Sequence, residues 1–263
     1  MSELKNKIAV VYGAGGAIGS AVARAFAREG ARLFLTGHRL APVQAVAEDI
    51  VSAGGVAEVD EVDALDEQAI DRHLQSVMTK AGRIDISLNA VGNAPAKYLG
   101  ASLVDMDLQK FLMPITSYTT SYFLTARLAA RRMIPSKSGV IMTVTAPPAR
   151  IATPNGGYGT SQAAKEALTR YLSKELAPQG IRVIGLQPHA MPETDTIKEI
   201  FKSRADTAGI TWEQFGSYLA GMNHPQRFLT LAETANVAVF MASDKASGMM
   251  GTTVNVTMGG LDD

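Results

Sequence analysis

Short apolar runs alternate with longer segments of helical periodicity along this chain. The first run, at 8–13, ends in a glycine-rich turn, and the segment after it repeats apolar residues at helical spacing until Gly30. Five further apolar runs follow, at 32–37, 84–92, 139–146, 181–188 and 252–258, and the segment 56–62 alternates as another strand does. Such continuous apolar runs are typical of strands buried on both faces. The pattern therefore predicts an α/β fold: a doubly wound parallel sheet of about seven strands with helices on both faces.

No stretch of the sequence separates two domains. Because no Pro/Gly/Ser-rich linker or internal repeat interrupts the alternation, we predict one domain over residues 1–263. Residues 193–228 are helical in character but less periodic, and they lie between a strand end and the closing elements. This segment is either a flap that covers a substrate or a structural excursion, and we interpret it as a flap.

The composition excludes several classes of function. The 25 Lys and Arg residues balance the 25 Asp and Glu residues, so we expect a small-molecule substrate and no nucleic-acid partner. No run reaches the roughly 18 to 20 apolar residues of a membrane span, and no signal-peptide cleavage site follows the first residues. We therefore expect a cytoplasmic protein without membrane contact. With no cysteine and four scattered histidines, we expect no metal site.

Four glycines lie between the first predicted strand and the first predicted helix. They are Gly13, Gly15, Gly16 and Gly19, in the sequence "YGAGGAIGSAV". Glycine allows the backbone to turn tightly and to approach a pyrophosphate at the positive N-terminus of a helix. Close packing of a strand on a helix would also explain such a turn, so the turn alone leaves both interpretations open.

Five segments together resemble the short-chain dehydrogenase/reductase family. In the turn, Gly13, Ile18 and Gly19 are similar to the family's T-G-x-x-x-G-I-G, with Ala17 in place of its middle glycine. The segments "DALD", "DISLNAVG", "YGTSQAAKEALTR" and "ELAPQGIRVIGLQP" resemble the family's later motifs in the same order. The resemblance covers nearly the whole chain and implies a Rossmann fold that binds a nicotinamide dinucleotide.

The resemblance also implies which residues bind the cofactor. From the pyrophosphate and adenine to the nicotinamide, they are Gly13, Gly15, Gly16, Ile18, Gly19, Asp63, Ala64, Asn89, Ala90, Gly92, Tyr158, Gln162, Pro188 and Thr194. In the family's nicotinamide-binding P-G-x-x-x-T segment, His189 here replaces the glycine, and one residue is inserted.

The end of the second predicted strand favours one of the two nicotinamide cofactors. An acidic residue there binds the ribose 2′-hydroxyl of NAD and repels the 2′-phosphate of NADP. This chain has Gly37, His38 and Arg39 instead. Because Arg39 can pair with a phosphate through its planar fork, we predict NADP(H) rather than NAD(H). The alternative is that Arg39 is a solvated surface charge.

Tyr158 matches the tyrosine that, in the family, donates a proton to the substrate carbonyl. The family's lysine four residues later, which lowers the pKa of that tyrosine, is here Gln162. A neutral amide can bind a ribose hydroxyl but cannot favour a tyrosinate electrostatically. Tyr158 is therefore expected to serve better as an acid in reduction than as a base in alcohol oxidation.

Two further catalytic positions of the family are changed. Counting back from Tyr158 places Thr145 at the substrate-orienting serine, whereas counting from Gly139 places Ala146 there. A gap-free count through the helical stretch 105–134, interrupted at Pro114, places Tyr118 at the asparagine that holds a relay water. Tyr118 is either a substitute acid or a packing residue.

Lys165 is a possible replacement for the missing cation. Seven residues at about 100° each bring Lys165 to within about 20° of Tyr158 on one helix face, but about 10 Å along the axis. The alternative is an ordinary solvated or interface lysine.

These features lead to a hypothesis and its alternatives. The first is an NADP(H)-dependent oxidoreductase that transfers hydride to a small carbonyl or activated alkene, with Tyr158 or Tyr118 as acid and Thr145 as orienting hydroxyl. The alternative is a catalytically divergent protein that binds the dinucleotide as a sensor or assembly partner. A weaker reading keeps the pocket for elimination or isomerisation. The resemblance also implies a homotetramer or homodimer built on the helices near 111–133 and 161–176.

Overall fold

Seven parallel strands form one sheet in the order β3-β2-β1-β4-β5-β6-β7. The structure is a computed structural model, and it describes residues 2–92, 102–152 and 155–262. The strands are β1 Ile8–Tyr12, β2 Arg32–Gly37, β3 Val56–Glu61, β4 Ile86–Asn89, β5 Gly139–Val144, β6 Ile181–Pro188 and β7 Thr253–Val256. All neighbouring pairs are parallel, which confirms the predicted doubly wound sheet.

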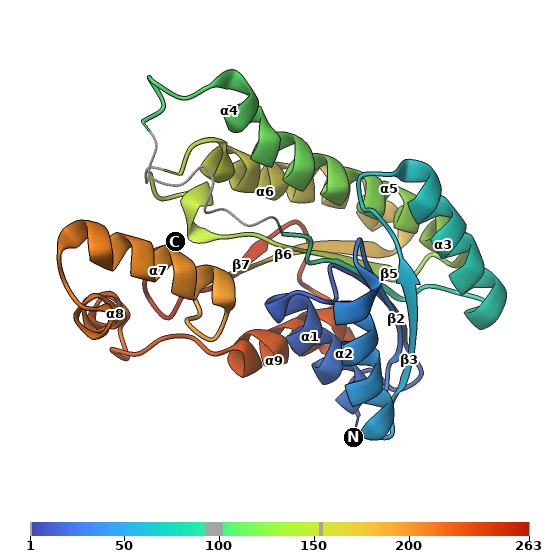
Figure 1. Cartoon of the computed structure of the whole chain (residues 1–263). Helices are drawn as coiled ribbons and strands as arrows, with labels where there is room; N and C mark the ends of the chain where they lie inside the picture. The colour runs from blue at the N-terminus through green and yellow to red at the C-terminus, as the bar shows by residue number, and fades with distance from the viewer. Residues whose placement is uncertain (1, 93–101, 153–154, 263) are drawn as a thin grey trace.

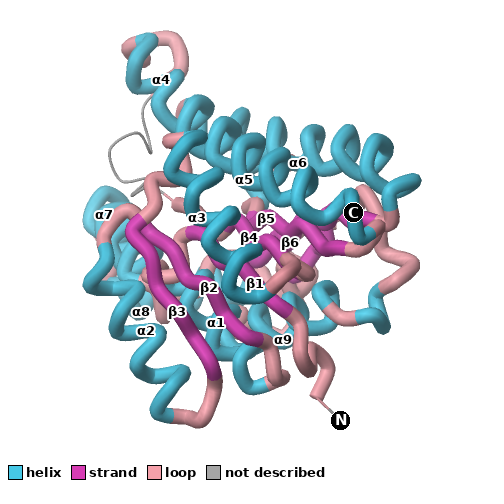
Figure 2. Tube along the Cα trace, turned by 90° about the vertical axis from the view of Figure 1, so that its right-hand side faces the viewer, coloured by secondary structure: helices cyan, strands magenta, loops and turns pink. Residues whose placement is uncertain are grey.

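Helices cover both faces of the sheet (Figures 1 and 2). α1, α2 and α9 pack on one face, and α3, α5 and α6 pack on the other, so two apolar cores lie on either side of the strands. The helices are α1 Ala17–Arg28, α2 Leu40–Ser52, α3 Glu67–Ala81, α4 Leu108–Pro114, α5 Thr120–Met133, α6 Gly157–Leu176, α7 Asp195–Ala208, α8 Trp212–Gly221 and α9 Leu231–Ala242. The inner strands β1, β4, β5 and β6 are buried from both sides, as their continuous apolar sequence predicts, whereas the edge strand β3 is partly exposed.

The stretch expected to be one interrupted helix contains a π-helix. α4 begins at Leu108, capped by the Asp107 side chain, and ends at Pro114. The π-helix η2 follows over Ile115–Thr119 and leads directly into α5. Because proline has no amide hydrogen, the helical hydrogen-bond ladder cannot continue regularly through it. The interruption predicted at Pro114 therefore takes the form of a wider helical turn.

Residues 193–228 contain the helices α7 and α8, which lie beside the sheet layers in Figure 1. The Phe201 ring packs against the rings of Trp212, Phe215 and Phe228, at centroid distances of 5.7, 5.6 and 5.9 Å. Aromatic contacts of this kind join the two helices and the segment after them into one packed unit.

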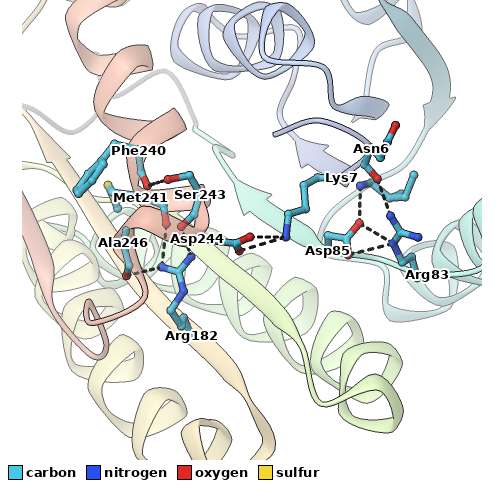
Figure 3. A network of polar contacts seen from close by, with 11 residues as sticks. Asn6, Lys7, Arg83, Asp85, Arg182, Phe240, Met241, Ser243, Asp244 and Ala246 are labelled. Carbon is cyan, nitrogen blue, oxygen red and sulfur yellow. Dashed lines mark hydrogen bonds and ion pairs between the residues drawn. The ribbon is translucent and has the colours of Figure 1, made fainter. Parts of the chain in front are cut away.

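A polar network fastens the chain at the amino ends of the strands (Figure 3). The buried Arg182 guanidinium of β6 donates to the backbone oxygens of Met241, Ser243 and Ala246 at the end of α9, at 2.9 to 3.1 Å. Lys7, before β1, pairs with Asp244 at 3.2 Å. This network lies at the amino ends of the strands, and the glycine-rich turn lies at their opposite, carboxyl ends.

Candidate active site

The predicted site residues gather along the carboxyl edge of the sheet. β1 and β4 are neighbours, and the chain order reverses between them, which makes this the switch point where a doubly wound sheet binds ligands. Gly13 and Asn89 lie at the ends of these two strands, Thr145 directly follows β5, and Pro188 ends β6. Residues from four strands are therefore brought to one edge.

The glycine turn has no room for side chains at two of its positions. A Cβ at Gly13, which has a φ of +75°, would lie 2.6 Å from the Ala90 carbonyl oxygen. A Cβ at Gly19 would lie 2.2 Å from the Gly13 carbonyl oxygen. Such separations are far below van der Waals contact, so both positions need glycine.

The N-terminus of α1 fits an anionic group. Gly16 is the N-cap residue, and no side chain caps the first amides of this 12-residue helix. Its first turn holds no acidic residue. Unpartnered amides at the positive end of a helix bind phosphate groups, so the turn fits the pyrophosphate of a dinucleotide.

His38 and Arg39 are exposed at the end of β2. Arg39 occupies the N-cap position of α2, and no carboxylate among the described residues lies within ion-pair distance of it. Beyond β3, the Asp63 carboxylate accepts the Leu65 amide at 2.9 Å, and the Ala64 side chain is buried. The end of β2 therefore carries a positive charge and no acidic residue of its own, while Glu61 on the neighbouring strand β3 is the register partner of Gly37.

Asn89 and Gly92 lie between the glycine turn and the tyrosines. The buried Asn89 amide donates to Thr125 Oγ1 at 3.0 Å, while its Oδ1 has no partner among the described residues. The Ala90 amide donates to the Tyr12 carbonyl oxygen at 2.9 Å. A Cβ at Gly92 would lie 3.9 Å from the Tyr118 hydroxyl oxygen. Tyr118, carried by η2, thus reaches the segment that follows β4.

Tyr118 and Tyr158 meet edge to face. Their ring centroids are 5.4 Å apart with an interplanar angle of 70°. Tyr158 lies in the first turn of α6, and this helix end packs tightly because a Cβ at Gly157 would lie 2.0 Å from the Phe111 carbonyl oxygen. The structure therefore brings together the two phenols that the sequence singled out.

Thr145, which the count back from Tyr158 selects, directly follows β5, and Ala146 comes after it. Its amide donates to the Leu186 carbonyl oxygen at 2.7 Å, and its side chain is 3% exposed. Thr145 Oγ1 has no hydrogen-bond partner in the described part of the chain. A buried hydroxyl without a partner is costly, so a group that binds there would satisfy it.

Gln162 is buried in α6 and places no charge in the site. Its side chain is 1% exposed, and its Nε2 donates to Ser161 Oγ at 3.2 Å. The Ser161 hydroxyl in turn donates to the Tyr158 carbonyl oxygen at 2.6 Å. The amide of Gln162 is therefore linked to the backbone of the tyrosine turn.

Lys165 is buried, so the alternative of a solvated lysine is wrong. Its side chain is 1% exposed, and its Nζ donates to the Val144 carbonyl oxygen at 2.5 Å. The ammonium also lies 5.7 Å from the ring centroid of Tyr118 and 5.9 Å from that of Tyr122. Burial lowers the pKa of Lys165 to about 7. The seven-residue spacing from Tyr158 was the only sequence signal for this position.

The segment after β6 contains Thr194 and His189, two residues of the predicted nicotinamide-binding segment. The Thr194 hydroxyl caps α7 by accepting the Ile197 amide at 3.3 Å. His189 has a buried Nδ1 without a partner among the described residues, and burial lowers its pKa.

Groups of three or more His, Asp or Glu side chains that could hold a metal ion do not occur in the described residues. No helix in the described part of the chain is long and apolar enough to cross a membrane.

Comparisons with known proteins agree with this geometry. A family model described as enoyl-(acyl carrier protein) reductase matches residues 13–260. The 7alpha-hydroxysteroid dehydrogenase of Escherichia coli is 28% identical over 262 residues, which cover 99% of this chain and 96% of that protein. Sorbitol-6-phosphate 2-dehydrogenase from Erwinia amylovora has a TM-score of 0.90 at 25% identity, covering 97% of this chain and 100% of that one. The NAD+-bound xylitol dehydrogenase has a TM-score of 0.89 at 25% identity, with coverages of 96% and 98%.

A parallel sheet with a glycine turn at its switch point defines an α/β protein of the Rossmann type. The family match extends from that turn almost to the last residue. The chain belongs to the short-chain dehydrogenase/reductase family of oxidoreductases, which confirms the resemblance of its motifs.

Proposed function

We propose that this protein is an NADP(H)-dependent reductase of a small carbonyl compound or activated alkene. One observation carries the proposal: two tyrosines in ring contact and an unpartnered buried Thr145 hydroxyl lie on the carboxyl edge of the sheet. The glycine turn on the same edge fits a pyrophosphate. Acids and hydroxyls beside a dinucleotide-binding turn are the groups that carbonyl reduction needs.

Each side chain has a role that follows from its chemistry. When bound, the dinucleotide supplies the hydride. Tyr158 or Tyr118 donates a proton to the substrate oxygen, and Thr145 Oγ1 orients that oxygen. A phenol with the ordinary tyrosine pKa of about 10 holds its proton at neutral pH and can donate it to a substrate oxygen. Reduction is therefore the direction that this site serves best near neutrality.

The NADP(H) preference is part of the proposal and is supported by the end of β2. His38 and Arg39 are exposed there, and Gly37 occupies the place where NAD-dependent proteins carry an acid. The Arg39 guanidinium can form two parallel hydrogen bonds with a phosphate. The similarity of the chain to the dehydrogenases named above supports an enzyme with redox turnover rather than a protein that only binds the dinucleotide.

The experiment measures oxidation of NADPH and of NADH with a panel of small ketones, aldehydes and enones. The decrease in cofactor absorbance is followed for the wild type and for Tyr158→Phe, Tyr118→Phe and Thr145→Val. The variant that removes the proton donor is expected to lower kcat about 100-fold or more. Tyr171→Phe is the matched control, because Tyr171 lies on the same helix but is 77% exposed.

Two outcomes would contradict the proposal. Tight NADPH binding without oxidation by any member of the panel would identify a dinucleotide-binding protein without redox turnover. Substrate consumption without net oxidation of the cofactor would point instead to elimination or isomerisation.

A further inference from the structure

We propose that Lys165 is a positioning residue of this site and supplies, through Tyr118, the positive charge that Gln162 lacks. This inference rests on the proposed reductase function and names a group that the family's motif does not contain. Four observations carry it: the burial of Lys165, its hydrogen bond to β5, its place over the Tyr118 ring, and the contact of Tyr118 with Tyr158.

Lys165 is the point where three parts of the site meet. It belongs to α6, which also carries Tyr158. Its Nζ donates to the Val144 carbonyl oxygen, one residue before Thr145. The same ammonium lies 5.7 Å from the centroid of the Tyr118 ring on η2. The Lys165 ammonium therefore contacts the end of β5 beside Thr145 and lies close to the Tyr118 ring on η2.

No carboxylate in the described part of the chain neutralises Lys165. The neighbouring acid on α6, Glu166, accepts the Gln187 amide at 2.6 Å and pairs with Arg150 at 3.3 Å. β5 carries no titratable residue, and the titratable side chains that face the ammonium from η2 and α5 are the phenols of Tyr118 and Tyr122. A buried ammonium without an opposite charge is costly and would be retained at a structural position only with difficulty.

Tyr118, and not Tyr122, connects Lys165 to the reaction. The Tyr122 hydroxyl shares a hydrogen bond of 3.0 Å with Thr169 inside the core, and Tyr122 is fully buried. The Tyr118 hydroxyl lies beside Gly92, on the proposed path of the dinucleotide. A positive charge within about 6 Å favours the phenolate that develops when the phenol gives up its proton. Lys165 is thus expected to promote proton donation by Tyr118.

The charge on Lys165 is expected to depend on pH near neutrality. Because burial lowers its pKa to about 7, Lys165 is charged below about pH 7 and increasingly neutral above it. The reduction rate should therefore fall as pH rises through this range. A lysine with an ordinary pKa would cause no such fall near neutrality, because it would stay charged to about pH 10.

The test compares Lys165→Met with the wild type over a range of pH. Methionine keeps the length and apolar stem of the side chain but has no charge. At pH values below 7, we expect kcat for carbonyl reduction to be at least tenfold lower in Lys165→Met than in the wild type. The kcat of the variant should no longer depend on pH, and its dissociation constant for NADPH should stay within about threefold of the wild-type value. Lys174→Met, at an exposed position of the same helix, is the matched control.

A double-mutant cycle with Tyr118→Phe decides whether Lys165 acts through Tyr118. We expect Lys165→Met to cause no further loss of kcat in the Tyr118→Phe background. A loss that persists in that background, or a Lys165→Met variant with the wild-type pH profile, overturns the proposal.

A measurement without turnover separates this proposal from the reductase function. In the wild-type protein, the NMR resonance of the Lys165 ε-carbon is titrated and assigned by its absence in Lys165→Met. A midpoint near pH 7 supports the assigned cation even if no carbonyl is reduced. A midpoint among those of the exposed lysines overturns it. An absence of turnover in the wild type contradicts only the reductase.

Discussion

Arg39 determines the expected cofactor preference at the level of a single side chain. It is exposed at the N-cap of α2 and faces no acidic partner among the described residues. Replacement by alanine removes the guanidinium fork without disturbing a buried contact. Arg39→Ala is expected to weaken NADPH binding about tenfold or more and to leave NADH binding within about twofold, because only NADPH carries the 2′-phosphate.

Fluorescence titration of both cofactors measures this preference. Arg28→Ala is a suitable control, because Arg28 is an exposed arginine at the C-terminal end of α1, far from the glycine turn at its N-terminal end. Equal losses for NADPH and NADH in Arg39→Ala, or no loss for either, would contradict the role of Arg39 in cofactor choice.

Single residues also show where sequence reasoning succeeds and where it stops. The need for glycine at Gly13 and Gly19 could be predicted, because a tight turn between a strand and a helix is determined by neighbours along the chain. The surroundings of Lys165 could not be predicted. They depend on Val144 of β5 and on the Tyr118 ring of η2, which are distant in sequence and meet Lys165 only when the sheet and helices pack.

At the level of elements, α7 and α8 form the unit that we interpret as a flap. Phe201 is 5% exposed and contacts three other aromatic rings, so it holds this unit together. Phe201→Ala is expected to loosen the two helices, at a local cost of about 3 kcal/mol, while the sheet and its two cores stay folded. The KM for the carbonyl substrate should rise several-fold, with kcat changed less than about threefold.

Limited proteolysis and steady-state kinetics check this expectation together. Cleavage within 195–221 should become faster in Phe201→Ala, whereas Tyr218→Ala, at an exposed aromatic residue of α8, should behave as the wild type does. Faster cleavage with an unchanged KM would show that the segment does not cover the substrate.

The helices illustrate how local signals translate into structure. Asp66 and Gly82 are the N-cap and the left-handed C-cap of α3, and both are residue types that signal a helix boundary in a sequence. Pro114 predicted an interruption, but no sequence rule says whether a proline ends a helix or widens one turn. That choice depends on contacts of α4 and η2 with α6, which lie far away in the sequence.

For the whole molecule, the outer faces of α5 and α6 are the expected contact between copies. These two helices lie side by side on one face of the sheet, and Phe123 and Tyr171 are 39% and 77% exposed on them. Exposed aromatic residues on adjacent long helices are typical of protein interfaces. We therefore expect the wild type to have the mass of a dimer or tetramer of the 27.8 kDa chain.

Tyr171→Glu should reduce that mass, because a carboxylate is costly in an apolar interface. Light scattering coupled to size-exclusion chromatography measures it, and Tyr218→Glu on α8 provides the control at another exposed tyrosine. A wild-type mass of one chain, or an assembly that persists in Tyr171→Glu and Phe123→Glu, would contradict this interface.

The overall architecture was the most predictable property of the chain. The seven segments expected to be strands are strands, since burial of the inner strands on both faces demands continuous apolar sequence and the connections between parallel strands demand helices. The site was less predictable than the fold. The glycine turn of its cofactor side is local in sequence, whereas its catalytic side joins residues from β5, η2 and α6.

Because the π-helix Ile115–Thr119 joins α4 to α5, the number of residues in this helical segment is as important to the site as its side chains. One residue more or fewer in a helix rotates everything beyond it by about 100°. A single deletion within η2 would turn α4 against α5 and move the Phe111 carbonyl away from Gly157, where α6 begins. An alteration that removes no functional group could therefore separate Tyr118 from Tyr158, and insertions or deletions here should be tolerated less than substitutions.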